Sequence, residues 1–226
     1  MTAIVYLYAL VDEEPAGDLG EGIAGEPLHL IRANGIAAVA GAMSERPGPD
    51  REILEKQDAV VRRLAERFGA ILPARFGEAF ADESALSQRI AAHDHSLTDA
   101  LALVRGCVQM TLRVFGDGEP VADSVPELTG GAGTRFLAAR KRERERARSL
   151  PEIEPLREAL RSHLRAERTV RHDAGRLLGT AYHLVPRAET AAYLATLEQA
   201  RERLGSRRVT VTGPWPPYAF GPEPGT

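Results

Sequence analysis

The residue types that commonly do chemistry are scattered along this chain. Residues 20–25 match the pattern GxGxxG, which binds a pyrophosphate only where it joins a strand directly to a helix. Here eight residues separate the motif from the preceding apolar run, and Pro27 follows it. Glu21 and Glu26 would also repel a phosphate. The segment therefore favours a flexible loop over a nucleotide site.

The six histidines and the single cysteine form no metal or nucleophile pattern. His93 and His95 are two apart on a predicted helix, so their side chains diverge and cannot share a metal. Neither HExxH nor GxSxG occurs. Cys107 begins a predicted strand with no histidine near it in sequence, which favours a buried, inert thiol. We therefore expect no catalytic residue, no cofactor and no metal in a chain that is not an enzyme.

Two segments are richer in special residues than a turn or a terminus needs. In residues 72–80, LPARFGEAF, one arginine stands between apolar residues, and we expect its guanidinium to order the segment by hydrogen bonds to carbonyls. Residues 213–220, GPWPPYAF, hold the only tryptophan on a proline-stiffened backbone, which predicts an extended conformation near polyproline II. Such a segment docks on its own protein or on a partner. The candidates for protein interaction or domain locking are Pro73, Arg75, Phe76, Gly77, Phe80, Trp215, Pro216, Pro217, Tyr218 and Phe220.

The elements that must hold the first segment follow from the periodicity of residues 1–104. The apolar run 3–11 predicts a strand buried on both faces. Asn34-Gly35 between two apolar segments predicts a hairpin, because both turn positions need positive φ. The remaining elements are a helix over 50–69 with Asp50 and Gly69 as its caps, a short strand over 70–76, and one helix over 82–104 with His93 on its apolar face.

After Gly106 the apolar residues alternate, so 107–115 predict an antiparallel strand with one exposed face. Residues 134–173 predict a long charged helix broken near Pro151, whose thin apolar stripe suits a helical arm. A strand over 176–185, a helix over 190–204 and a strand over 209–212 follow. The class is therefore α+β, with a domain boundary near 105–107. The second half suits a ferredoxin-like βαββαβ plan with one strand unaccounted for.

Composition excludes several classes of protein. Apolar residues make up 43% of the 226 residues and charged residues 27%, which is typical of globular domains and not of disordered chains. No apolar stretch is long enough to cross a bilayer, and the N-terminus lacks the basic start of a signal peptide. One cysteine fits a reducing cytoplasm. A net charge of −3 does not favour nucleic acid as a partner.

Five segments, in order along the chain, are similar to the gas vesicle protein F/L family (GvpL/GvpF). The most specific are LPARFG at 72–77 and GPWPPYAF at 213–220. The others are Val5-Tyr6-Leu7-Tyr8, Gly133-Thr134-Arg135-Phe136-Leu137 and Thr180-Ala181-Tyr182-His183-Leu184-Val185-Pro186. The family more often has tyrosine where Phe136 stands.

The resemblance implies two α+β domains. These are an N-terminal mixed domain over 1–106 and a modified ferredoxin-like domain over 107–213 with a helical arm at 134–173. An extended tail, 214–226, packs back on the domains. The implied function is that of an accessory or minor structural protein of gas vesicle assembly. It would bind the hydrophobic shell subunit and other gas vesicle accessory proteins, in the cytoplasm and without nucleic acid, lipid membrane or cofactor.

We take the surface around Pro73–Phe80 as the working surface, acting through a sheet edge or an apolar patch. The alternative is a ligand-binding or catalytic ferredoxin-like α+β protein. An RNA-binding sheet ranks last, because the predicted exposed strand face carries no aromatic residue to stack on bases. The residues leave open whether the chain is of the F or the L type.

Overall fold

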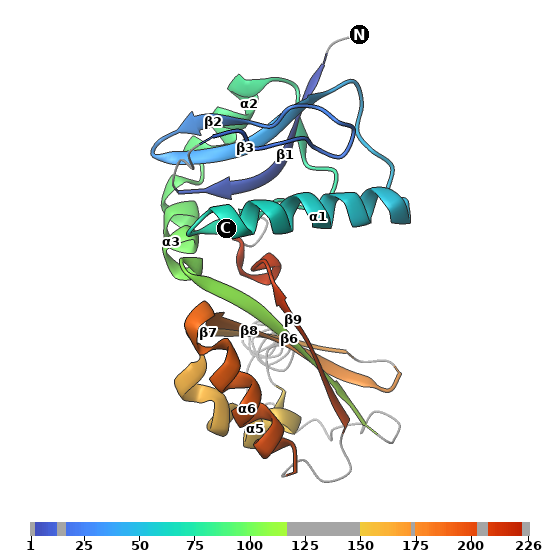
Figure 1. Cartoon of the computed structure of the whole chain (residues 1–226), viewed down its shortest axis with the longest axis vertical. Helices are drawn as coiled ribbons and strands as arrows, with labels where there is room; N and C mark the ends of the chain where they lie inside the picture. The colour runs from blue at the N-terminus through green and yellow to red at the C-terminus, as the bar shows by residue number, and fades with distance from the viewer. Residues whose placement is uncertain (1–2, 13–16, 117–149, 173–174, 203–207, 223–226) are drawn as a thin grey trace, which may run out of the picture. The chain divides into compact units, whose positions relative to one another are not determined.

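The computed structural model describes residues 3–12, 17–116, 150–172, 175–202 and 208–222. They form two compact units (Figure 1). Unit 1 extends to Val108 and also contains the C-terminal segment from Trp215, and unit 2 is Gln109–Pro214. Each unit combines a β-sheet with helices, which confirms the predicted α+β class. The domain limits drawn from the sequence stay a prediction.

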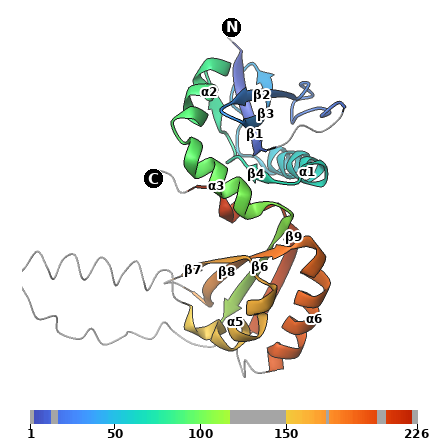
Figure 2. The same cartoon turned by 90° about the vertical axis from the view of Figure 1, so that its left-hand side faces the viewer.

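Unit 1 contains a five-stranded sheet with the order β2-β3-β1-β4, in which β5 also pairs with β1. Figure 2 shows α1 on one face of this sheet and α2 and α3 on the other. The bounds are β1 (Ile4–Val11), β2 (His29–Ala33), β3 (Ile36–Met43), α1 (Arg51–Arg67), β4 (Ile71–Pro73), β5 (Ala79–Phe80), α2 (Glu83–Ala91) and α3 (Asp94–Val104).

The strongest local patterns in unit 1 produce the elements they predict. β1 is buried on both faces over most of its length. Asn34 and Gly35 turn the β2–β3 hairpin with φ of 49° and 78°. The Asp50 carboxylate caps α1 by accepting a 3.0 Å hydrogen bond from the Ile53 amide. The predicted Gly69 cap is wrong, because the helix ends at Phe68 in an extended conformation.

Two other elements of unit 1 are shorter than predicted. The helix expected over 82–104 is two helices, since the backbone leaves helical geometry at His93 with φ −125° and ψ 17°. His93 is consequently half-buried at the start of α3 rather than on a continuous apolar face. The strand expected over 70–76 ends at Pro73. The chain then turns through Gly77, at φ +79°, and resumes as β5.

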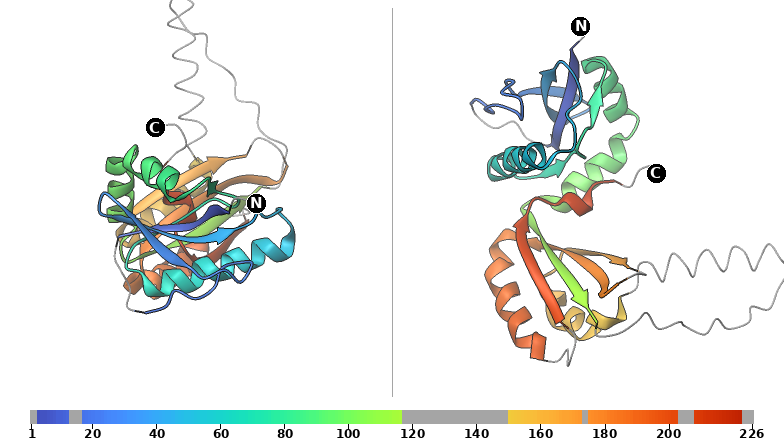
Figure 3. Two further views of the ribbon diagram at one scale, coloured as in Figure 1. Left: turned by 90° about the horizontal axis from the view of Figure 1, so that it is seen from above. Right: turned by 90° about the vertical axis from the view of Figure 1, so that its right-hand side faces the viewer.

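Unit 2 contains a four-stranded sheet with the order β7-β8-β6-β9. Its described elements follow the order strand, helix, strand, strand, helix, strand. Figure 3 shows α5 and α6 against the sheet. The bounds are β6 (Cys107–Phe115), α5 (Glu154–Leu160), β7 (Ala166–Arg171), β8 (Leu177–Pro186), α6 (Thr190–Arg201) and β9 (Arg208–Trp215), with 3-10 turns η1 (Pro151–Ile153), η2 (Arg161–His163) and η3 (Arg187–Glu189). A further 3-10 turn, η5 (Tyr218–Phe220), follows β9 and belongs to unit 1.

The strand missing from the sequence-based plan is β7, within the predicted long helix. Residues 166–171 pair antiparallel with β8, from Ala166 opposite Leu184 to Arg171 opposite Gly179. The prediction of helix to residue 173 is therefore wrong. Its apolar stripe is core, because Leu150, Ile153, Leu156 and Leu160 are all fully buried. Residues 134–149 of the predicted arm, with Leu137 and the Arg-rich run, lie outside the described residues.

The prediction of an exposed face on β6 is wrong at two of its three polar positions, and only Arg113 is exposed. Gln109 and Thr111 are buried, and the Gln109 amide donates a 3.1 Å hydrogen bond to the Thr111 hydroxyl. Polar side chains that satisfy one another can be buried at modest cost. The C-terminal segment likewise departs from a simple extended tail, since β9 continues to Trp215 and η5 follows. Among the described residues, no helix is long and apolar enough to cross a membrane.

Candidate interaction site

The first candidate segment, Pro73–Phe80, connects β4 to β5, and we call it the β4–β5 loop. Both of its ends are fixed to one strand, because Pro73 pairs with Ala9 and Phe80 pairs with Val5 of β1. At its tip, Gly77 adopts a φ of +79°, a left-handed conformation that glycine tolerates best. The loop is therefore short, turned and anchored at each end.

Backbone groups order this loop. The Glu78 amide donates to the Arg75 carbonyl over 3.1 Å, and the Arg75 amide donates to the Glu78 carboxylate over 3.3 Å. The expectation that the Arg75 guanidinium orders the loop is wrong, since the described residues offer it no carbonyl partner. Arg75 is exposed instead. Phe76, the next residue, and Phe80, five positions further on, are half-buried. The loop thus presents one cation and two partly accessible aromatic rings.

Two buried tyrosines of β1 hold two different loops. The Tyr6 hydroxyl accepts a 3.0 Å hydrogen bond from the Gly77 amide and donates to the Gln57 side chain on α1. The Tyr8 hydroxyl accepts a 2.9 Å bond from the Ile23 amide and donates to the Glu26 carboxylate. Burial raises the pKa of both hydroxyls, so both keep the protons that they donate.

The segment with the GxGxxG pattern is held around Glu26. The Ala24 amide donates to the Glu26 carboxylate over 2.9 Å, and the Gly22 amide donates to the Glu26 carbonyl over 2.8 Å. A Cβ at Gly22 would lie 2.0 Å from the Glu26 carboxylate, and one at Gly41 would lie 2.5 Å from Glu26 Cγ. The prediction of a flexible loop is therefore wrong. These two glycines make room for a carboxylate of the chain itself.

The second candidate segment docks on α1. The Arg62 guanidinium lies 4.2 Å from the centre of the Trp215 ring, a cation–π geometry. The Tyr218 hydroxyl donates to Asp58 Oδ1 over 3.1 Å. Asp58 and Arg62 also pair with each other over 2.6 Å. Phe220 is 1% exposed, which makes it the buried anchor of this segment.

The C-terminal segment also reaches β4. Its turn η5 forms because the amides of Tyr218 and Phe220 donate to the carbonyls of Pro216 and Pro217, and both prolines are buried. The turn contacts β4, the strand that leads into the β4–β5 loop. All ten candidate residues therefore lie in unit 1, and the two candidate segments meet at β4.

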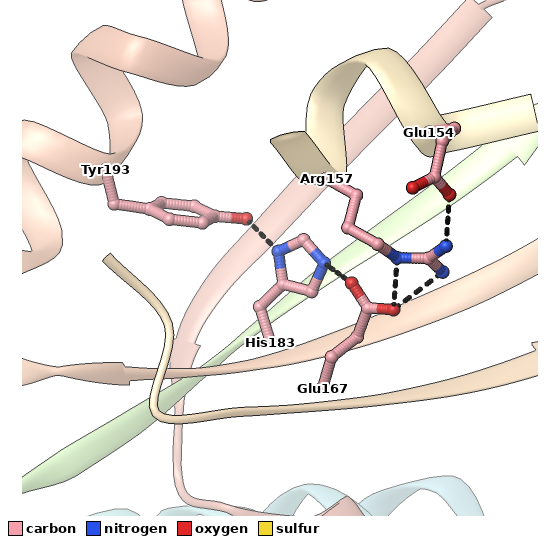
Figure 4. Close-up of polar contacts among 5 residues, drawn as sticks. All are labelled: Glu154, Arg157, Glu167, His183 and Tyr193. Carbon is pink, nitrogen blue, oxygen red and sulfur yellow. Dashed lines mark hydrogen bonds and ion pairs between the residues drawn. The ribbon is translucent and has the colours of Figure 1, made fainter. Parts of the chain in front are cut away.

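Unit 2 contains a buried polar chain that the sequence did not reveal (Figure 4). The hydroxyl of Tyr193 on α6 bonds Nδ1 of His183 on β8 over 2.9 Å. His183 Nε2 lies 3.2 Å from a carboxylate oxygen of Glu167 on β7. Arg157 of α5 donates to the other oxygen through Nε, over 2.9 Å, and also pairs with Glu154. The five residues come from four elements, α5, β7, β8 and α6, which sequence spacing cannot show.

The electrostatics of these five side chains favour a structural role for their hydrogen bonds and ion pairs. Burial alone would raise the pKa of Glu167, but the hydrogen bonds from His183 and Arg157 outweigh it and lower this pKa to about 2. Burial raises the pKa of Tyr193. Both ring nitrogens of His183 face a polar partner, Tyr193 at Nδ1 and Glu167 at Nε2. Because His183 is fully buried, a substrate cannot reach it. The hydrogen bonds and ion pairs of these side chains join α5 and α6 to the sheet.

No group of three or more His, Cys, Asp or Glu side chains in the described part of the chain is placed to hold a metal ion. Cys107, the single cysteine of the sequence, is buried as expected. The candidate interaction residues therefore lie in the β4–β5 loop and in the docked C-terminal segment. A role of either segment in contacts with other proteins stays a prediction.

The gas vesicle synthesis protein GvpL/GvpF family matches residues 4–222. The chain therefore belongs to this family, and the resemblance read from its sequence is confirmed. This is a family of gas vesicle structural and assembly proteins and not of enzymes, so the chain has a gas vesicle-related role.

Individual relatives agree with this assignment. Gas vesicle protein L2 of Halobacterium salinarum is 28% identical over 258 residues, covering 96% of this chain and 91% of that protein. The crystal structure of gas vesicle protein GvpF from Microcystis aeruginosa matches with a TM-score of 0.72 at 20% identity, over 97% of this chain and 99% of that chain. GvpF from Anabaena matches with a TM-score of 0.73 at 15% identity, over 98% and 97%.

Proposed function

We propose that this chain is an accessory protein of gas vesicle assembly that binds the hydrophobic shell subunit through the β4–β5 loop of unit 1. The observation that carries the proposal is the exposure of Arg75 on a loop fixed at both ends to β1. A fixed loop loses little conformational freedom on binding, so more of its contact energy becomes affinity.

The side chains of the loop suit an apolar partner. Phe76 and Phe80 are half-buried, so each ring is already supported on one side and has surface left to cover. Aromatic residues and arginine are the types enriched where protein interfaces bind most strongly. Arg75 supplies a cation that can bond carbonyl or carboxylate groups of the partner. The partner then covers apolar surface without requiring unit 1 to unfold.

Side-chain contact is a better mode of binding here than strand addition. β5 has only two residues, and the Arg46 guanidinium donates a 2.9 Å hydrogen bond to the Ala79 carbonyl. That bond occupies an acceptor of β5 which an added strand would use. The apolar patch is therefore the favoured mode of the two that the sequence left open.

The C-terminal segment supports this surface from within unit 1. Its turn η5 contacts β4, and Phe220 is buried. Other gas vesicle proteins are further expected partners, through surfaces that we leave unassigned. The protein would then act in association with gas vesicles in the cytoplasm.

The test is co-expression of the chain with the shell subunit, followed by capture of the complex. Arg75→Glu and Phe80→Asp should each reduce capture at least about tenfold, the effect of losing an interface anchor. Arg89→Glu is the matched control, because Arg89 is an exposed arginine on α2 and the change reverses the same charge. Thermal unfolding by circular dichroism identifies variants that remain folded.

Undiminished capture by folded Arg75→Glu and Phe80→Asp chains would remove this surface from consideration. An equal loss in Arg89→Glu would mean that net charge, and not the loop, governs binding. The alternative of a ligand-binding or catalytic protein gains no support from the buried chain around His183, because its groups are closed to a substrate.

A further inference from the structure

We infer that Tyr6 is a positioning residue for the β4–β5 loop, holding the loop in the conformation that meets its protein partner. This inference rests on the proposed function, because the loop is the proposed contact surface. Tyr6 itself is fully buried and touches no partner. It acts through the backbone of Gly77, to which it is joined by a 3.0 Å hydrogen bond.

The Tyr6 hydroxyl is built into a chain of bonds that runs from α1 to the loop. It donates to Gln57, a buried side chain of α1, and this fixes the direction of its proton. Its oxygen is then turned to accept the Gly77 amide. The bond falls at the turn of the loop, where no pairing with β1 is available until Glu78, whose carbonyl accepts from Leu7 over 2.9 Å.

The position of Gly77 decides where the binding side chains point. Gly77 lies directly after Phe76 and two residues after Arg75, and its φ of +79° sets the direction of the turn. Without the Tyr6 bond, the loop keeps its two ends on β1 and the internal bonds between Arg75 and Glu78. Its tip gains freedom, and binding must then restrict that freedom at a cost in affinity.

Tyr8 provides a control of the same kind on the same strand. Both tyrosines are fully buried, and their rings meet edge to face with centres 5.0 Å apart. Each hydroxyl accepts one loop amide and donates to one side chain. Only the loop differs, since Tyr8 holds Ile23 in the segment around Glu26. Replacing either tyrosine by phenylalanine removes one hydroxyl and preserves the buried ring.

The experiment compares Tyr6→Phe with Tyr8→Phe in the full chain, using amide hydrogen exchange by NMR and capture of the shell subunit. Tyr6→Phe should speed exchange at Gly77 at least about tenfold, as expected when a local hydrogen bond is lost, and leave Ile23 unchanged. It should weaken capture about five- to tenfold. Tyr8→Phe should speed exchange at Ile23 alone and leave capture unchanged. Gln57→Leu, which removes the acceptor of the Tyr6 proton, should act on Gly77 in the same direction and serves where Tyr6→Phe does not fold.

Several outcomes overturn the inference. Unchanged exchange at Gly77 would mean that Tyr6 does not hold the loop. If Tyr6→Phe speeds exchange at Gly77 and leaves capture undiminished, while Arg75→Glu abolishes capture, the result would support the proposed surface and rule out a positioning role for Tyr6. Equal losses of capture in the two phenylalanine variants would make Tyr6 a contributor to stability only. If Arg75→Glu and Phe80→Asp also capture the shell subunit normally, the proposed function itself fails, which the exchange data separate from the role of Tyr6.

Discussion

The Tyr218 hydroxyl donates a 3.1 Å hydrogen bond to Asp58, joining the end of the chain to α1 of unit 1. One turn further along α1, Arg62 lies over the Trp215 ring. The C-terminal segment is therefore an integral part of unit 1 although it follows unit 2 in sequence. Deleting the segment would uncover apolar surface that the rest of unit 1 does not cover.

The contacts of this segment should differ in their contribution to stability. Phe220→Ala should lower the free energy of unfolding by about 3–5 kcal/mol, the cost of emptying a fully buried aromatic site. Tyr218→Phe should cost about 1 kcal/mol, because its hydrogen bond is partly exposed. Urea denaturation measures both, with Tyr182→Phe in unit 2 as a control. A Phe220→Ala chain as stable as the wild type would contradict the docking described here.

The buried chain in unit 2 should make stability depend on pH. The pKa of Glu167 is lowered from 4.5 to about 2 in the folded state. Its ionised form therefore stabilises the fold above pH 4.5, and this contribution is lost as the pH falls toward 2. Shifts of this size correspond to roughly 3 kcal/mol. Urea unfolding of Glu167→Gln should show a deficit of that order at pH 7 that shrinks steadily below pH 4.5. A deficit that is independent of pH would contradict the ion-pair role.

Tyr193 should matter through its hydroxyl as well as through its ring. Tyr193→Phe leaves Nδ1 of His183 without its 2.9 Å partner in a fully buried position. An unpaired buried polar atom costs about 1–3 kcal/mol, so the free energy of unfolding should fall by that amount. A double-mutant cycle with His183→Phe measures the coupling directly. Additive effects of the two changes would mean that the residues do not interact.

The glycines around Glu26 should be intolerant of a methyl group. Gly22→Ala would place a Cβ 2.0 Å from the Glu26 carboxylate and 2.4 Å from the Tyr8 hydroxyl. We therefore expect the free energy of unfolding to fall by at least about 2 kcal/mol. Gly48→Ala is the control, since a Cβ there meets nothing within 4 Å. Thermal unfolding compares the two chains. Equal melting temperatures would mean that the hydrogen bonds to Glu26 do not order this loop.

Local signals in the sequence predicted much of unit 1. The apolar run of β1, the Asn34-Gly35 turn and the Asp50 cap each act within a few residues, so each element could be predicted from its own segment. The failures also have local causes. Residues 166–171, AERTVR, carry charges at positions typical of a solvated helix. They are a strand because pairing with β8 and the bonds of Glu167 outweigh that preference.

The polar sites depended on contacts between distant elements. The sequence favours a flexible loop around Glu26, yet this carboxylate is buried and accepts a hydrogen bond from the Tyr8 hydroxyl. His183 lies in one of the segments that resemble the family, but its partners Glu167 and Tyr193 come from β7 and α6. The candidate interaction residues lie in two segments of unusual composition, which is a signal that the sequence itself carries. The hydrogen bond between Tyr6 and Gly77 spans 71 positions, so no local pattern in the sequence predicts it.

The most direct test of shell binding by the β4–β5 loop is photo-crosslinking during gas vesicle assembly. A photoreactive phenylalanine analogue at Ala81, an exposed position next to Phe80, leaves every proposed binding residue in place. Ala92, the exposed residue directly after α2, is the matched position. We predict a crosslink to the shell subunit from position 81 and none from position 92. No crosslink from 81, or equal crosslinks from both positions, would contradict the account.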